Sequence, residues 1–163
     1  MTCTVREMNS HDRATWAQMR AALRPDEAPQ AGVEGIDEIL GADDAWGFVA
    51  ETAEGVPAGF AEVAIRKYAN GCETMPVPFL EGIWVAAQFR RHGIGARLIE
   101  HVETFLAARG YREIGSDTRL DNSVSQAAHV AWGFSETERV VYFRKSLLDI
   151  AANQTTRRPP ANT

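Results

Sequence analysis

The pattern of hydrophobic and polar positions predicts a sheet. Runs of β-favouring residues bounded by Gly and Pro predict strands over these segments: Cys3 to Glu7, Ala45 to Glu51, Ala58 to Lys67, Phe79 to Ala86, Glu113 to Asp117 and Glu138 to Lys145. Residues 53–57 separate the second and third segments and have turn composition, which predicts a hairpin. The fourth segment is apolar almost throughout, as central strands are, but Glu81 and Gly82 interrupt it.

Apolar positions spaced three and four residues apart predict helices between these strands. The first helix follows Asn9 and Ser10, either of which can cap it, and ends before Pro25 and Pro29. Its buried stripe lies at i, i+3 and i+7 and comprises Trp16, Met19 and Leu23. Residues 32–41 predict at most a short second helix. Residues 94–108 give the strongest helical pattern, and Gly110 follows them, where helices commonly end. A last helix is expected from a cap at Asp121 or Asn122 to about Trp132.

The order of these elements predicts one α/β domain, with a mixed sheet flanked by helices, over residues 1–150. A chain of 163 residues is long enough to bury a substantial core without disulfides or metals. Residues 151–163 show no periodicity and contain Arg157-Arg158-Pro159-Pro160, so we expect a flexible tail there.

Composition and charge exclude several classes of protein. The chain has 17 Lys and Arg against 22 Asp and Glu, a net charge of −5, and 45% hydrophobic residues. It has no apolar run of about 18 residues, and its start lacks the basic-then-apolar order of a secretory signal, so we expect a cytoplasmic protein that does not enter membranes. Cys3 and Cys72 fit neither a disulfide framework nor zinc-ligand spacing, which predicts two plain thiols and no metal.

The acidic residues are unevenly distributed. Residues 25–65 contain ten Asp and Glu and no Lys or Arg, which makes nucleic acid an unfavourable partner. Two interpretations stay open at this point: a solvated acidic face, or an electrostatic field that concentrates a cationic small molecule.

The clearest chemical signal lies between a buried strand and a long helix. The hexapeptide Arg90-Arg91-His92-Gly93-Ile94-Gly95 places glycines, positive charge and free backbone N–H groups at a helix start, where anions bind. The phosphate-loop pattern fails because no Gly-Lys-Ser/Thr follows, and the dinucleotide pattern fails because Leu98 takes the third glycine position. The hexapeptide alone therefore indicates either another diphosphate or only a glycine-containing helix start.

The surrounding sequence resembles a known superfamily. The run EGIWVAAQFRRHGIGARLI, residues 81–99, resembles the central motif of the GCN5-related N-acetyltransferases (GNAT), and Asp121-Asn122 with AWGF, residues 131–134, resembles their second motif. Three further segments are similar to the aminoglycoside 6′-N-acetyltransferases: YANGCETMPVPFLEGI (68–83), Ser116-Asp117 with Leu120-Asp121-Asn122, and ETERVVYF (136–143).

The resemblance implies acetyl-CoA as co-substrate, bound largely by main-chain groups. By this analogy the backbone of Ile83, Trp84 and Val85 pairs with the pantetheine arm, and Asn122 binds the cofactor further along. The pyrophosphate would be held by the backbone of Arg91, His92, Gly93, Ile94, Gly95 and Ala96.

Glu81 is the candidate catalytic base. A carboxylate inside an apolar strand costs free energy unless it is paired or functional, so a satisfied buried acid is the alternative. An amine attacks a thioester only when neutral, and a base must take its proton directly or through water. The resemblance also implies that Glu81 contacts the substrate amine. A backbone N–H near Ile83 is the expected oxyanion donor, and Gly82 would permit a bulge that aims it.

The resemblance implies further substrate contacts and leaves the general acid open. Asp117 and Glu138 would bind substrate ammonium groups, with a surface salt bridge as the alternative for Glu138, and Tyr68 would contact the sugar. In many superfamily members a tyrosine protonates the leaving thiolate, but that position here is His129; Tyr142 is a second candidate, and departure without a proton is the third. Arg24 stands where related enzymes carry a tryptophan near the substrate, and a cation there would repel an aminoglycoside.

These features predict an acetyl-CoA-dependent enzyme that acetylates the 6′-amine of aminoglycosides, and so confers resistance to them. The same fold acting on a polyamine, a metabolite or a protein N-terminus is one alternative, and a non-catalytic acyl-CoA sensor is another. Relatives are often dimers, so the resemblance also implies a homodimer, in which the long final strand could be exchanged between subunits.

Overall fold

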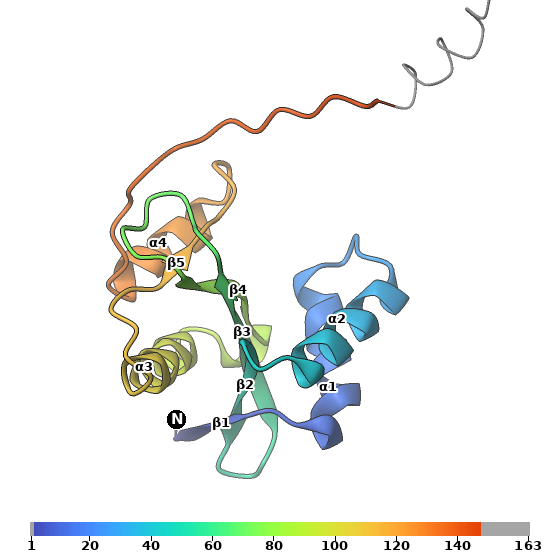
Figure 1. The fold of residues 1–163 in the computed structure, drawn as a ribbon. Helices are drawn as coiled ribbons and strands as arrows, with labels where there is room; N and C mark the ends of the chain where they lie inside the picture. The colour runs from blue at the N-terminus through green and yellow to red at the C-terminus, as the bar shows by residue number, and fades with distance from the viewer. Residues whose placement is uncertain (1, 148–163) are drawn as a thin grey trace, which may run out of the picture.

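A computed structural model describes residues 2–147 and consists of a central sheet with helices on both sides (Figure 1). Its five strands are β1 (Cys3–Glu7), β2 (Ala45–Thr52), β3 (Pro57–Arg66), β4 (Val77–Val85) and β5 (Gly115–Ser116). The expected tail, residues 151–163, lies outside the described residues. Among the described residues no helix is long and apolar enough to cross a membrane.

The strands lie side by side in chain order, β1-β2-β3-β4-β5. The first three pairings are antiparallel and the last, β4 with β5, is parallel, so the predicted mixed sheet is confirmed. The parallel ladder covers only two positions, Phe79 with Gly115 and Leu80 with Ser116. Beyond Leu80, β4 therefore continues without β5 beside it.

Helices cover both faces of the sheet (Figure 1). One face packs against α3 (Ile94–Ala107), whose buried residues meet Phe48, Ala61 and Leu80 from the sheet. The other face packs against α1 (Arg13–Leu23) and α2 (Pro29–Gly41), with Trp16 and Ile36 fully buried there. Because successive strand side chains point to opposite faces, neighbouring strand residues serve the two cores separately.

The helices agree with the sequence pattern apart from one boundary. Asn9 caps a short 3-10 helix (Ser10–Asp12) that leads into α1, and Asn122 caps α4 (Ser123–Ala131) by accepting from the Ser125 amide. Helix α2 begins at Pro29, three residues before the predicted start, and its 13 residues exceed the short helix that was expected. Proline fits the first turn of a helix because its missing N–H would have no partner there.

The predicted strand over residues 138–145 is wrong for this chain, because these residues belong to no strand and pair with no edge. They lie extended and exposed beyond α4 (Figure 1). Their alternation of β-favouring residues gives strand propensity, but a strand also needs a hydrogen-bonding neighbour, and β5 is two residues long instead of the predicted five.

The acidic segment, residues 25–65, does not form a single solvated face. Three of its acids pair with arginines from outside the segment: Glu51 with Arg6, Asp37 with Arg13, and Glu62 with Arg20 and Arg24. Glu62 is fully buried, whereas Asp26, Glu27 and Glu54 are exposed. Three of the ten acids are therefore balanced by arginines from outside the segment.

Candidate active site

The site is organised by a β-bulge at Glu81. In the β3–β4 ladder Val63 pairs with Leu80 and Glu62 pairs with Gly82, so Glu81 has no partner of its own. A bulge bends the strand and redirects the side chain of the extra residue. The bulge that Gly82 was expected to permit is confirmed. It lies at the point where β4 loses β5 on its other side.

The Glu81 carboxylate is held by an arginine that the sequence pattern did not indicate. Arg66 donates from Nε to Oε1 and from Nη2 to Oε2 of Glu81, both at 2.7 Å. This is a bidentate ion pair, the strongest geometry between these two groups. The two side chains are 39% and 30% exposed, so solvent reaches the pair. Glu81 is therefore neither buried nor free.

Beneath the bulge lies a second charged cluster, made of Glu62, Trp16, Arg20 and Arg24. Glu62 is 1% exposed and accepts from Trp16 Nε1 at 2.6 Å, while Arg20 Nε lies 3.2 Å and Arg24 Nη1 3.8 Å from its carboxylate oxygens. Burial raises the pKa of Glu62, and the charge of Arg20 and the bond from Trp16 partly offset that shift.

Arg24 connects the two clusters. Its Nη2 donates to the backbone oxygen of Glu81 at 2.9 Å, so the carbonyl of the bulged residue has a hydrogen-bond partner. A Cβ on Gly82 would lie 3.0 Å from Leu23 and 3.3 Å from Arg24, which leaves little room for a larger residue. The positive charge of Arg24 thus lies beside a buried carboxylate, while 30% of its side chain is exposed to solvent.

The predicted pantetheine strand has the required open edge. Ile83, Trp84 and Val85 pair with β3 through Ala61, Phe60 and Gly59, whereas β5 stops at the level of Leu80. The other edge of β4 beyond the bulge is therefore not covered by a strand of the described chain, although Arg90 Nε donates to the Val85 oxygen at 2.9 Å. An extended ligand could add to this edge as a further strand.

The start of α3 has the geometry of an anion site. Gly93 is the N-cap with φ of 78°, Arg91 also has a positive φ of 64°, and no side chain caps the free N–H groups. Arg91, His92, Gly93 and Ala96 are exposed, whereas Ile94 is buried in the core. A Cβ built on Gly93 meets nothing within 4 Å, so the space above the loop is open. These features fit a diphosphate.

Gly95 has a different role from Gly93. A Cβ on Gly95 would lie 2.7 Å from Trp132 Cζ2, closer than real contacts allow. Gly95 therefore lets the residue that ends α4 pack against the first turn of α3.

His129 is tied at both ring nitrogens. Its Nδ1 lies 2.8 Å from the Ser125 backbone oxygen, and its Nε2 lies 2.8 Å from the Ser116 hydroxyl. A carbonyl oxygen only accepts, so Nδ1 carries a proton and donates it to Ser125, while Nε2 shares a hydrogen bond with the Ser116 hydroxyl. The ring also packs against Trp132 and Phe134. This arrangement makes His129 a link between α4 and the residue before Asp117.

The other predicted substrate residues are exposed around this centre. Asp117 and Tyr142 are close enough to Arg66 to raise its pKa, after the larger effect of the bonds to Glu81. Tyr68 and Glu138 are also exposed, and no contact brings either of them to Glu81. Thr137 lies against Gly71, which holds the start of the last segment beside the loop that precedes β4. Asn122 caps α4, and its Oδ1 is engaged with the Ser125 amide.

Arg66 and Glu62 are the site residues that sequence reasoning missed. Glu62 had a signal, since it is a carboxylate within a run of strand residues, but it was counted only as one of the acids of residues 25–65. Arg66 is the first basic residue after that acidic segment. Its partner is 15 positions away, and no local pattern indicates that pairing.

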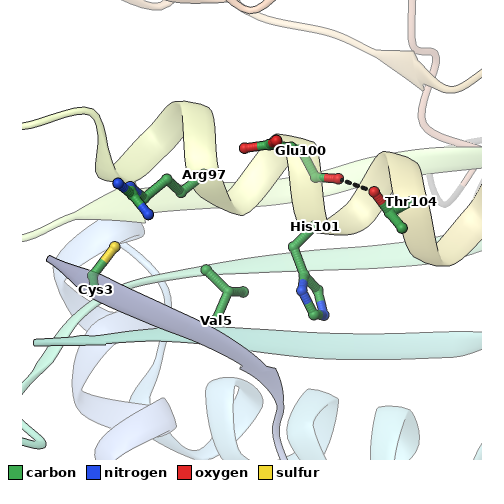
Figure 2. Close-up of a pocket in the computed structure, with 6 residues that line it drawn as sticks. All are labelled: Cys3, Val5, Arg97, Glu100, His101 and Thr104. Carbon is green, nitrogen blue, oxygen red and sulfur yellow. Dashed lines mark hydrogen bonds between the residues drawn. The ribbon is translucent and has the colours of Figure 1, made fainter. Parts of the chain in front are cut away.

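A pocket of about 280 Å³ lies elsewhere, between β1 and α3. Figure 2 shows Cys3 and Val5 of β1 facing side chains of α3, among them Arg97 and His101. None of the predicted site residues lines this pocket. Cys3 and Cys72 are both free thiols, as predicted.

Comparison with known proteins decides the family. Residues 13–134 match the model of the acetyltransferase (GNAT) family. The chain belongs to the GNAT family. The chain is 43% identical over 142 residues to an aminoglycoside N(6′)-acetyltransferase type 1 of Salmonella enteritidis. The aligned region covers 86% of this chain and 97% of that protein. The chain is also 45% identical over 139 residues to the enzyme of the same name from Serratia marcescens, covering 84% and 95%.

Solved structures of aminoglycoside acetyltransferases have the same fold as this chain. The structure of AAC(6′)-Iy in complex with the bisubstrate analogue CoA-S-monomethyl-acetylneamine is 41% identical, has a TM-score of 0.84 and covers 90% of this chain and 99% of that one. An aminoglycoside 6′-N-acetyltransferase of Acinetobacter baumannii is 34% identical, with a TM-score of 0.82 and coverage of 89% and 99%. The predicted GNAT fold is thereby confirmed.

Proposed function

We propose that this GNAT protein transfers the acetyl group of acetyl-CoA to the 6′-amine of aminoglycosides, directly and within a ternary complex. The observation that carries the proposal is its likeness, over nearly the whole chain, to a structure that holds CoA and an aminoglycoside joined in one analogue. Acetylation removes a positive charge and a hydrogen-bond donor from the drug, which is how such an enzyme would confer resistance.

The cofactor site is proposed on main-chain groups. The open edge of β4 at Ile83, Trp84 and Val85 would pair with the pantetheine arm, and the first turn of α3, with the loop Arg91 to Ala96, would hold the pyrophosphate. Acetyl-CoA supplies the thioester that the amine attacks. Asn122 already caps α4, so its backbone is the better candidate for a contact with the cofactor.

Glu81 is proposed as the general base. The bulge projects its carboxylate at the point where β4 opens, next to the edge on which the thioester would lie. A carboxylate there can take a proton from the substrate ammonium directly or through water, and a backbone N–H near Ile83 can stabilise the oxyanion. Arg24 acts as a positioning residue, because it holds the Glu81 carbonyl and has its own charge balanced by Glu62.

We propose that the thiolate leaves without a proton from His129. Its Nε2 shares a hydrogen bond with the Ser116 hydroxyl, and its Nδ1 proton is bonded to the Ser125 oxygen, so both ring nitrogens are engaged within the protein. Its role would be to hold Ser116 and thereby Asp117. Tyr142 is exposed and carries a hydroxyl that can donate, so it is the remaining acid. Asp117, Glu138 and Tyr68 would contact the drug from the exposed rim.

We also propose that the protein is a homodimer in which residues 138–145 add to the sheet of a second copy. The segment is extended, and its centre carries apolar side chains on both faces: Val141 and Phe143 on one, Val140 and Tyr142 on the other. A strand with two apolar faces is typical of the inside of a protein. Here these side chains are exposed, Phe143 by 93%.

The reaction is tested by thiol release from acetyl-CoA with purified protein, using kanamycin beside a matched aminoglycoside whose 6′ group is a hydroxyl. We expect turnover with the amine only. If neither compound reacts while acetyl-CoA still binds, the aminoglycoside proposal fails, and another amine or an acyl-CoA sensor takes its place.

The same assay tests Glu81. E81Q keeps the shape of the side chain but cannot take a proton, so we expect kcat to fall by about 100-fold, with the affinity for acetyl-CoA retained. E103Q, on the exposed side of α3, is the matched control and should behave as the wild type. Unchanged turnover in E81Q would remove this residue from the mechanism.

A further inference from the structure

The further inference concerns Arg66 and what its position on Glu81 means for substrate binding. Both carboxylate oxygens of Glu81 accept from the Arg66 guanidinium at 2.7 Å, so the fork occupies the oxygen pair that the substrate's 6′-ammonium would also need. Two cations cannot both use this pair in the same geometry, because the bidentate arrangement engages both oxygens along the guanidinium plane.

Arg66 is built to remain charged and to stay near the site after leaving Glu81. Its guanidinium carbon lies 3.5 Å from the centroid of the Phe79 ring, and a cation is attracted to such a ring face. The charged and titratable groups that act on it are Glu81, Asp117 and Tyr142. On the other side of Glu81, Arg24 contacts the backbone oxygen rather than the carboxylate.

We propose that Arg66 is a placeholder cation: it occupies the position on Glu81 that the substrate ammonium takes, and substrate binds by exchanging one cation for the other. This inference rests on the proposed function, since it names how that site receives its amine. The exchange leaves Glu81 with one positive partner before and after binding. The ring of Phe79, on which the guanidinium already lies, can keep Arg66 beside the site once it is displaced.

The exposure of the pair makes the exchange feasible. A fully buried ion pair would be too costly to open, whereas Arg66 and Glu81 are 39% and 30% exposed, and a solvated pair of this kind contributes modestly. The exchange also gives selectivity: a neutral 6′-hydroxyl cannot replace a guanidinium on a carboxylate, but an ammonium can.

The test compares R66M, R66K and the control K67M by calorimetric binding of kanamycin and by steady-state kinetics. K67M removes the same charge from the exposed neighbouring residue without touching Glu81. Because R66M removes the competing cation, we expect its Kd and KM for kanamycin to fall about three- to tenfold. R66K should be intermediate, because an ammonium makes one contact where the fork makes two, and K67M should bind as the wild type does.

Other results would overturn the inference. An unchanged or higher Kd in R66M would show that Arg66 positions Glu81 for substrate instead of competing with substrate. If R66M loses acetyl-CoA binding and so its fold, R66K decides: Kd for kanamycin about twofold lower supports the exchange, and no change or weaker binding refutes it. If the wild type acetylates kanamycin but the Arg66 variants bind kanamycin no more tightly, the exchange is refuted and the proposed function stands. Wild type that does not bind kanamycin would overturn both.

Discussion

At the residue scale, Glu62 is the side chain whose environment has the clearest energetic consequence. It is a buried carboxylate whose folded-state pKa lies above its ordinary value of 4.5, because burial disfavours the charged form. Between 4.5 and the raised value the folded protein holds a proton that the unfolded chain has lost. Glu62 therefore favours folding most below pH 4.5, and this contribution is lost as the pH rises through the folded pKa.

The difference between wild type and E62Q isolates this effect. We expect the free energy of unfolding of wild type, minus that of E62Q, to decrease as the pH is raised from about 4.5 in a series of urea titrations, by about 1.4 kcal/mol for each unit of pKa shift. E54Q is the control: the exposed Glu54 has a lowered pKa, so its difference should have the opposite sign and be small. If the Glu62 difference grew with pH, the two arginines beside it would outweigh its burial.

At the element scale, the junction between α3 and α4 depends on two glycines for different reasons. G95A puts a methyl group 2.7 Å from Trp132, so we expect it to lower the free energy of unfolding by about 1–3 kcal/mol in wild type but by less in a W132F background. G93A meets open space, and its cost of about 1–2 kcal/mol comes from φ of 78° alone. That cost should be equal in both backgrounds. Urea unfolding of G95A and G93A, each in the wild-type and W132F backgrounds, measures both costs. An equal loss of unfolding free energy for G95A in the two backgrounds would refute the steric explanation.

The elements themselves were largely predictable, because their signals are local. The period of residues 94–108, the caps Asn9 and Asn122, and the apolar run interrupted by Glu81 all lie in short stretches of sequence. The contacts that make the site were not predictable in this way. Trp16 and Glu62 are 46 positions apart, and Arg66 reaches Glu81 only because β3 and β4 pair across the bulge. Register, not propensity, creates those contacts.

At the scale of the whole molecule, residues 138–145 show where the local pattern was insufficient. The pattern predicted a strand there but could not supply a neighbour, since pairing depends on which sheet edge is available. Within one chain β5 offers two residues. A second copy offers another sheet, and a symmetric exchange would satisfy both segments at once.

The proposed strand-exchanged dimer can be tested directly by its mass in solution. Sedimentation velocity of wild type at micromolar concentration should give a dimer, and F143D should give a monomer. A symmetric exchange would bury Phe143 twice, at about 1.5–3 kcal/mol for each copy, so we expect the dissociation constant to rise by about 100-fold or more.

V56D is the matched control for F143D. Val56 is another exposed apolar residue, in the turn between β2 and β3, and the substitution adds the same charge outside the exchanged segment. It should remain a dimer. Hydrogen exchange adds a second readout, because the amides of residues 138–145 should be protected in wild type and V56D and unprotected in F143D. A monomeric wild type with unprotected amides in that segment would contradict strand exchange, and Tyr142 would then lie in an unpaired segment beside Arg66.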